Sequence, residues 1–225
     1  MTNNEYIVIL CDGAFPKNKY LLELIDNAAE IVCCDASILK LLKYRNVEDL
    51  QSVHIVGDMD TLSLSDQNKF SQFITKICDQ ETNDQTKAFH YALSRNFTKI
   101  FILGISGGRE DHTIGNISLL SDYKQEVASK EIEIVAFTDY GIFYPILNSS
   151  TFKCEPKSQV SIFAFDSTLK VKSDGLKYPT DNVIFDMWWK ATLNESIGET
   201  FSLTFSHPAK VLVYITFKEK LYLKV

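Results

Sequence analysis

Short apolar runs alternate with longer segments of helical periodicity over the first 140 residues of this 225-residue chain. This alternation is typical of repeated strand–helix units that build a mostly parallel sheet covered by helices. The apolar runs predict strands at residues 6–11, 31–35, 53–57, 73–78, 99–104 and 131–138. The segments between them predict helices at residues 17–29, 36–44, 65–70, 84–96 and 113–128. We therefore expect an α/β domain over residues 1–139.

The pattern changes after residue 139. Strand-like runs at residues 160–165, 201–205 and 211–217 are separated by Gly, Pro, Asn and Ser, without a convincing amphipathic helix. This pattern of short strands and turn residues predicts a second, all-β domain over residues 140–225. The tripeptide Asp139-Tyr140-Gly141 fits either a domain boundary or a turn inside one domain.

Composition and charge exclude several classes of partner. A hydrophobic content of 45% is enough to bury a substantial core. The net charge of -6, without a basic block, argues against nucleic acid as a partner. The apolar run at residues 6–11 has no basic residues before it and is too short for a signal peptide or a membrane span. The five cysteines have no zinc-binding spacing, so we expect reduced core thiols and a cytoplasmic protein.

Polar residues follow directly after each predicted strand of the α/β domain. Ligands of open α/β sheets bind at the carboxyl ends of the strands, so these positions are the candidate site. They are Cys11-Asp12-Gly13, Asp35, Gly57-Asp58-Met59-Asp60-Thr61, the run from Asp79 to Asp84, and the run from Ser106 to His112.

Acidic residues recur along this predicted rim. A turn at Gly57 would let the side chains of Asp58 and Asp60 converge. By themselves they fit a solvated acidic turn equally well. Asp35 and Asp84 at neighbouring strand ends add to the repulsion, which a cation would offset. Carboxylates beside phosphates are typical ligands of Mg²⁺.

Basic residues near the acids suggest phosphate binding. Asp84 fits the start of a helix, where it caps the helix or coordinates a metal ion. Lys87 would share its face, either as an ordinary ion pair or as a phosphate contact. Gly107-Gly108-Arg109 offers backbone amides and a bidentate donor for phosphate oxygens. Asp111 fits a partner of Arg109, and His112 fits a loop-orienting, capping or general-base role.

Taken in order, these segments resemble the thiamine pyrophosphokinase family. Cys34-Asp35-Ala36 resembles its Ala-Asp-Gly-Gly segment, although Ala36-Ser37 stand where that family usually has two glycines. The other matching motifs are Gly57-Asp58-Met59-Asp60-Thr61, the run from Asp79 to Lys87, and the run from Gly107 to His112 followed by Asn116 and Leu119. Shorter matches follow at Gly175-Leu176-Lys177-Tyr178 and Thr192-Leu193-Asn194-Glu195. Asn83 and Leu193 replace the usual Thr and Ser.

The resemblance implies an α/β nucleotide- and metal-binding domain followed by a smaller β-sandwich that binds thiamine. It implies a homodimer with active sites between subunits, and Mg²⁺-dependent transfer of pyrophosphate from ATP to the thiamine hydroxyl, giving AMP and thiamine diphosphate.

The resemblance also carries roles for particular residues. The expected metal ligands are Asp58, Asp60 and Asp84, and Gln80 and Arg109 join them as catalytic residues. The expected ATP-binding residues are Asp35, Thr61, Asn83, Lys87, Gly108, Arg109, Asp111 and His112. For thiamine, Thr192 and Asn194 are carried over from the motif. Trp188 or Trp189 offers a face for stacking and cation–π attraction, and Trp189 is our candidate; a core or interface role fits both equally well.

Two other functions remain as alternatives. A haloacid-dehalogenase-like phosphatase would need a Thr or Val at position 62, which is Leu62, and its acidic strand is usually the first rather than the third. A non-catalytic nucleotide- or thiamine-binding protein of the same fold is the other alternative. The chain has no GxxxxGK[ST] motif, so a Walker-type kinase is not supported.

Overall fold

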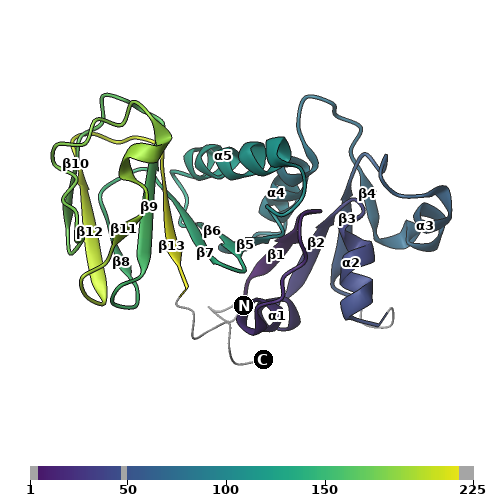
Figure 1. Ribbon diagram of the computed structural model, residues 1–225. Coiled ribbons are helices and arrows are strands. Elements are labelled where there is room, and N and C mark those ends of the chain that lie inside the picture. Colours follow the sequence, from purple (N-terminus) through teal and green to yellow (C-terminus); the bar gives the residue numbers. More distant parts are fainter. Residues whose placement is uncertain (1–4, 47–49, 218–225) are drawn as a thin grey trace. The chain divides into compact units, whose positions relative to one another are not determined.

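The computed structural model describes residues 5–46 and 50–217 (Figure 1). The chain divides into two compact units, one of Met1–Leu119 with Glu131–Asp139 and one of Leu120–Lys130 with Tyr140–Val225. The predicted boundary after residue 139 coincides with one of these divisions, whereas the segment Leu120–Lys130 belongs to the second unit. The functional assignment of residues 1–139 to nucleotide and metal and of residues 140–225 to thiamine stays a prediction.

The first unit contains a parallel sheet with strand order β6-β5-β1-β2-β3-β4. Its strands are β1 (Ile7–Leu10), β2 (Glu30–Cys34), β3 (Val53–Gly57), β4 (Ile74–Lys76), β5 (Lys99–Leu103) and β6 (Glu133–Thr138). In the central strand, Val8 lies opposite Ile31 on one side and Phe101 on the other. All four residues of β1 are buried, as expected for a strand covered on both faces. The predicted mostly parallel sheet is confirmed.

Helices flank this sheet in the order that its topology requires. They are α1 (Lys19–Asp26), α2 (Ser37–Tyr44), α3 (Leu64–Lys69), α4 (Asp84–Ser94) and α5 (Glu110–Glu126). The chain runs outward from β1 to β4 and then returns to β5 on the other side of β1. Because such crossovers are right-handed, α1 and α2 cover one face and α4 covers the other (Figure 1). The order reverses between β1 and β5, where ligands of such sheets bind.

Side-chain caps explain where two of these helices begin. Asn18 accepts a hydrogen bond from the backbone of Tyr20 at the start of α1, and Asn83 accepts one from Thr86 at the start of α4. Helix α5 starts at Glu110, three residues before the predicted 113. Its first turn holds Glu110 and Asp111, whose charges suit the positive end of a helix, so the helix takes in residues that were expected to form a loop.

The second unit contains two antiparallel sheets, of order β11-β9-β13-β7 and β10-β12-β8. Their strands are β7 (Gly141–Ile146), β8 (Ser150–Lys153), β9 (Gln159–Ala164), β10 (Val171–Asp174), β11 (Asn194–Glu195), β12 (Thr200–Phe205) and β13 (Val211–Thr216). Side chains of both sheets form one core cluster, in which the rings of Phe152 and Phe201 stack at 5.0 Å. This is a β-sandwich, and the prediction of an all-β second domain is confirmed.

Two features of the second unit were not predicted from the sequence. Four strands, β7, β8, β10 and β11, lie at residues that gave no separate strand prediction, because β7 contains Pro145 and the other three are at most four residues long. A short 3-10 helix, η3 (Trp188–Ala191), carries both tryptophans. Over the whole described part of the chain, no helix combines the length and apolar character that crossing a bilayer requires.

Candidate active site

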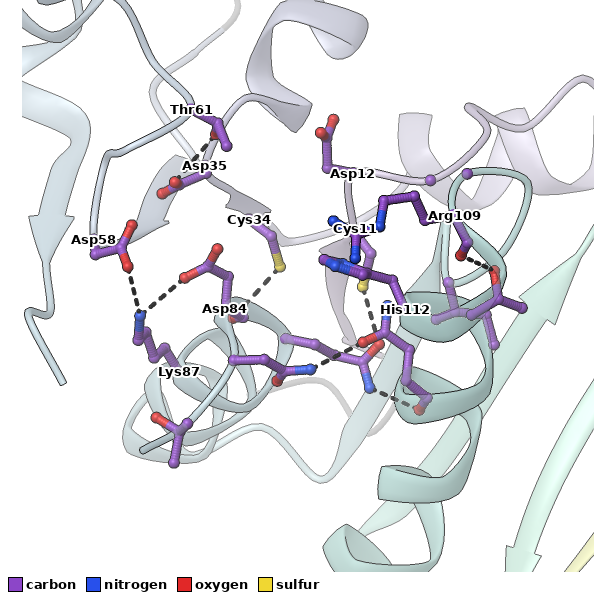
Figure 2. A pocket seen from close by; sticks show the side chains of 18 residues that line it. Cys11, Asp12, Cys34, Asp35, Asp58, Thr61, Asp84, Lys87, Arg109 and His112 are labelled. Carbon is purple, nitrogen blue, oxygen red and sulfur yellow. Dashed lines mark hydrogen bonds and ion pairs between the residues drawn. The ribbon is translucent and has the colours of Figure 1, made fainter. Parts of the chain in front are cut away.

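A pocket of about 420 Å³ lies at the carboxyl ends of β1, β2, β3 and β5 (Figure 2). The first turns of α4 and α5 close its other side. This is the position that the reversal of strand order predicts. The residues that line it are Cys11, Asp12, Gly13, Cys34, Asp35, Asp58, Thr61, Thr82, Asn83, Asp84, Gln85, Lys87, Ile105, Gly108, Arg109, His112, Thr113 and Asn116.

Three carboxylates gather at one end of the pocket. Asp35 follows β2, Asp58 follows β3, and Asp84 is the first residue of α4. One oxygen of each lies within 4.8 Å of the others (Figure 2). Asp35 is held in place by the backbone N–H of Met59, at 3.2 Å, and the hydroxyl of Thr61, at 3.1 Å. The end of the pocket is therefore a fixed cluster of acidic oxygens.

Lys87 is the cation within this acidic cluster. Its side chain is only 3% exposed, and its ammonium lies 3.1 Å from Asp84 and 3.5 Å from Asp58. Burial opposes the charge of Lys87, but its hydrogen bond and Coulombic attraction to Asp84 outweigh burial and raise its pKa. Burial likewise opposes the charge of Asp58, but a hydrogen bond from the backbone of Asp60, together with Lys87, lowers its pKa. One ammonium thus balances part of the charge of three acids.

Asp35 is the most deeply buried acid of the cluster, and its backbone conformation is strained. It is 2% exposed, and its backbone adopts a left-handed conformation with φ of 41°. Burial and then repulsion by Asp84 raise the pKa of Asp35 to about 6, against the opposing hydrogen bonds from Met59 and Thr61. The three acids offer only hard oxygen donors, and a divalent cation would relieve their repulsion. The cluster therefore fits Mg²⁺.

The replacement Asp35→Asn is expected to stabilise the cation-free protein at pH 7.5 by up to about 3 kcal/mol. A carboxyl whose pKa is raised on folding contributes stability below its unfolded pKa, near 4, and that contribution is lost as the pH rises through about 6. The gap between variant and wild type should therefore close below about pH 4. Urea unfolding in EDTA across this pH range measures it. A gap that stays constant with pH would contradict the assignment.

A glycine-rich turn after β5 lies at the opposite end of the pocket, where Gly108 forms part of the wall. Gly104 and Gly107 have φ of 71° and 83°, a conformation that side chains other than glycine rarely adopt. The guanidinium of Arg109 lies at this end and pairs with Asp111 at 2.6 Å. This hydrogen-bonded pair lowers the pKa of Asp111 to about 2. Both side chains are largely exposed, so Arg109 can exchange its partner for a phosphate group.

Most of the residues predicted for ATP and metal lie in this pocket, and three do not line it. Asp60 is exposed, because Met59 before it adopts a left-handed turn and buries its own side chain. Gln80 is exposed and donates to Asp58 at 3.3 Å. Asp111 contacts the site through Arg109 and through the backbone N–H of His112. Asp60 also lies outside the group of three acids that could hold a metal ion, although its backbone N–H binds Asp58.

The residues predicted for thiamine lie in the second unit. Asn194 is 5% exposed, and its side-chain amide binds the backbone N–H and carbonyl of Tyr178 at 3.1 and 2.7 Å. The hydroxyl of Thr192 donates to the carbonyl of Trp189. Trp189 is 67% exposed, whereas the ring of Trp188 packs edge-on against Phe165. Asn194 and Thr192 thus fix local structure, and Trp189 presents a free face.

Several residues that line the pocket were not assigned a role from the sequence. They are Cys11, Asp12, Gly13, Cys34, Thr82, Gln85, Ile105, Thr113 and Asn116. Cys11, Asp12 and Gly13 directly follow β1, so the rule that strand ends carry the site already points to them. Gln85 and Asn116 come together only in the folded chain, where Gln85 donates to the backbone carbonyl of Asn116 at 3.0 Å.

The fold and the site define an α/β protein with an acidic pocket at the carboxyl ends of its strands, followed by a β-sandwich. Family models identify it further: residues 21–135 match the catalytic domain of thiamin pyrophosphokinase, and residues 141–214 match its substrate-binding domain. The chain belongs to the thiamin pyrophosphokinase family.

Individual relatives agree with this assignment. The thiamine pyrophosphokinase of Bacillus subtilis (strain 168) is 27% identical over 135 residues, which span 58% of this chain and 62% of that protein. The crystal structure of thiamine pyrophosphokinase from Bacillus subtilis has a TM-score of 0.72 at 21% identity and covers 95% of this chain and all of that one. The thiamin pyrophosphokinase from Candida albicans has a TM-score of 0.75 at 18% identity, with 96% and 90% covered. At such identities these two structures establish the fold.

Proposed function

We propose that this protein transfers a pyrophosphoryl group from ATP to the hydroxyl group of thiamine, giving thiamine diphosphate and AMP. The observation that carries the proposal is the cluster of Asp35, Asp58 and Asp84 around the buried Lys87, in a chain that matches both domains of this enzyme family. The reaction forms a bond from the thiamine oxygen to the β-phosphorus and breaks the bond from that phosphorus to AMP. It calls for positioning and for neutralisation of charge more than for a strong base.

In this proposal the carboxylates hold Mg²⁺ as cofactor. Asp58 and Asp84 are its ligands, and Asp35 is a ligand or an immediate neighbour. Asp60, which lies outside this group in the structure, is proposed as a ligand on the sequence motif alone. When bound, the ion supplies positive charge to the phosphate oxygens of ATP. Thr61 keeps Asp35 oriented through its hydroxyl. Asn83 accepts hydrogen bonds from Thr86 and donates to Asn116, and so joins the first turn of α4 to α5.

The basic residues of the pocket balance the charge that develops on the phosphates. Lys87 is fixed between two acids, so it offers a charge whose position does not change during the reaction. Arg109 is exposed and exchanges Asp111 for a phosphate group. The backbone of Gly108 and the side chain of His112 line the same end of the pocket and complete the ATP site. Gln80, bonded to Asp58, lies near the reacting groups.

We further propose that thiamine stacks on Trp189 and that the protein is a cytoplasmic homodimer with active sites between subunits. Large apolar side chains are exposed along one stretch of the second unit, which suits an interface more than open solvent. They are Tyr178, Ile184, Met187, Trp188, Trp189, Leu193 and Ile197. Light scattering coupled to gel filtration tests the dimer, since a monomeric mass at micromolar concentration would exclude it.

The replacement Trp189→Ala is expected to raise the KM for thiamine about tenfold and to leave the KM for ATP unchanged, because the thiazolium ring loses its stacking partner. Trp188→Ala is the matched control. Its ring packs against Phe163 and Phe165, so its removal should lower the melting temperature more than it changes either KM. Steady-state kinetics of both variants decide. If both replacements raised the KM for thiamine equally, the assignment of Trp189 as the stacking partner would be contradicted.

Purified protein incubated with ATP, Mg²⁺ and thiamine tests the proposed function directly. Formation of AMP and thiamine diphosphate in equal amounts is the expected result. Binding of ATP and thiamine without formation of AMP would instead establish a non-catalytic binding protein of the same fold. The phosphatase alternative is not favoured, because Asp58 follows the third strand and the family assignment lies elsewhere.

A further inference from the structure

The loop that follows β1, residues 11–14, forms part of the pocket wall and is fixed from one side by its N–H groups. Gly13 donates to the carbonyl of Gly104 at 2.9 Å, and Ala14 donates to the carbonyl of Ser106 at 2.7 Å. A methyl group on Gly13 would lie 2.3 Å from both of these oxygens, so the two loops are in closest contact here. The position of the β1 loop therefore sets the position of the β5 loop, which leads into Gly108 and Arg109.

The carbonyl groups of the same loop point the other way, toward α2. Ser37 donates to the carbonyl of Leu10 at 2.7 Å. One turn further along α2, the ammonium of Lys40 lies 2.5 Å from the carbonyl oxygen of Asp12 and 2.7 Å from that of Gly13. Two consecutive peptide groups are thus held at both ends, by the β5 loop through their N–H groups and by α2 through their carbonyls.

All three acceptors of the Lys40 ammonium belong to this loop. Besides the two carbonyls, its ammonium binds the carboxylate of Asp12 at 2.7 Å. An ammonium group has three hydrogens to donate, and these three acceptors account for them. An exposed ion pair by itself contributes little to stability, but the bonds to two carbonyl groups fix the backbone of the pocket wall. Lys40 does not line the pocket, so it acts on a ligand only through residues 12 and 13.

We propose that Lys40 is a positioning residue for nucleotide binding: from α2 it fixes the peptide groups of Asp12 and Gly13, and through them the loop that carries Gly108 and Arg109. The identity of the nucleotide as ATP rests on the proposed function. Ser37, in the preceding turn of α2, supports the end of β1 just before this loop through its hydrogen bond to the carbonyl of Leu10.

Lys40→Met tests this inference, with Lys43→Met as the matched control. Lys43→Met is the same substitution one turn further along α2, at an exposed side chain. For Lys40→Met, the Kd for α,β-methylene-ATP in the presence of Mg²⁺, measured by calorimetry, is expected to increase about tenfold. The KM for thiamine should stay unchanged. Hydrogen exchange should become faster at the amides of Gly13 and Ala14, whereas exchange in β2 stays unchanged. Lys40→Arg should recover most of the affinity.

The outcomes separate positioning from general loss of structure and from failure of the proposed function. An unchanged Kd, or exchange that becomes faster throughout the first unit, would overturn the inference. Should Lys40→Met not fold, Lys40→Gln keeps two donors and is expected to raise the Kd about threefold; no change there would overturn the inference equally. A wild-type protein that binds the analogue but forms no AMP would refute the proposed reaction, while the comparison of positions 40 and 43 still decides the role of Lys40.

Discussion

Asp84→Asn is expected to lower kcat/KM for the formation of AMP from ATP and thiamine by about a thousandfold. The replacement removes one of the three carboxylates that face one another at the end of the pocket. It also removes the nearer of the two acids that hold the ammonium of Lys87. Both the proposed cation and the buried lysine thereby lose their common partner. A coupled assay for AMP under saturating and limiting Mg²⁺ measures the effect.

Asp66→Asn is the control for this experiment. Asp66 lies in the first turn of α3, so the same change removes the same charge from a helix start that is outside the pocket. Its activity should stay within about twofold of wild type, since such a charge contributes less than about 1 kcal/mol. Asp58→Asn should resemble Asp84→Asn. Asp60→Asn tests whether that residue is a metal ligand, as the sequence predicts, in spite of its exposed position. An Asp84→Asn variant that keeps a tenth of the wild-type activity would exclude the proposed metal site.

The order of strands and helices in the first unit can be predicted from the sequence. Its buried strands are continuous apolar runs, and a strand such as Val53–Gly57 was predicted with its observed bounds. The rule that ligands bind at strand ends also predicts, from the sequence alone, that Asp35, Asp58 and Asp84 lie near one another. What makes this possible is that a parallel sheet brings all carboxyl ends of its strands to one edge.

Other features depend on the tertiary structure and leave no local pattern. From the sequence, Lys87 fits an ordinary i,i+3 ion pair with Asp84 on a helix. Only the folded structure shows that Lys87 is buried and also pairs with Asp58. From the sequence, Lys40 is expected to be a surface residue of an amphipathic helix, because two of its three acceptors are backbone carbonyl groups that any sequence could supply. Asp60 follows the same strand as Asp58, but the left-handed turn at Met59 directs it elsewhere.

Gly57→Ala is expected to reduce the same activity at least a hundredfold, although it adds only one methyl group and removes no charge. That methyl group would lie 1.8 Å from an oxygen of Asp35 and 3.2 Å from an oxygen of Asp84. Asp35 is buried and accepts hydrogen bonds from Met59 and Thr61, so moving away from the methyl group would break these bonds. The cluster should open, and Mg²⁺ should no longer raise the melting temperature.

Gly115→Ala is the matched control, since nothing lies within 4 Å of the added methyl group in α5. In the interior of a helix this change should stabilise the protein by about 0.5–1 kcal/mol and leave the KM for ATP unchanged. Thermal denaturation with and without Mg²⁺, together with the AMP assay, compares the two variants. If Gly57→Ala retains both its response to Mg²⁺ and its activity, then Asp35 can move without loss, and the fixed arrangement of the three acids is not what the reaction requires.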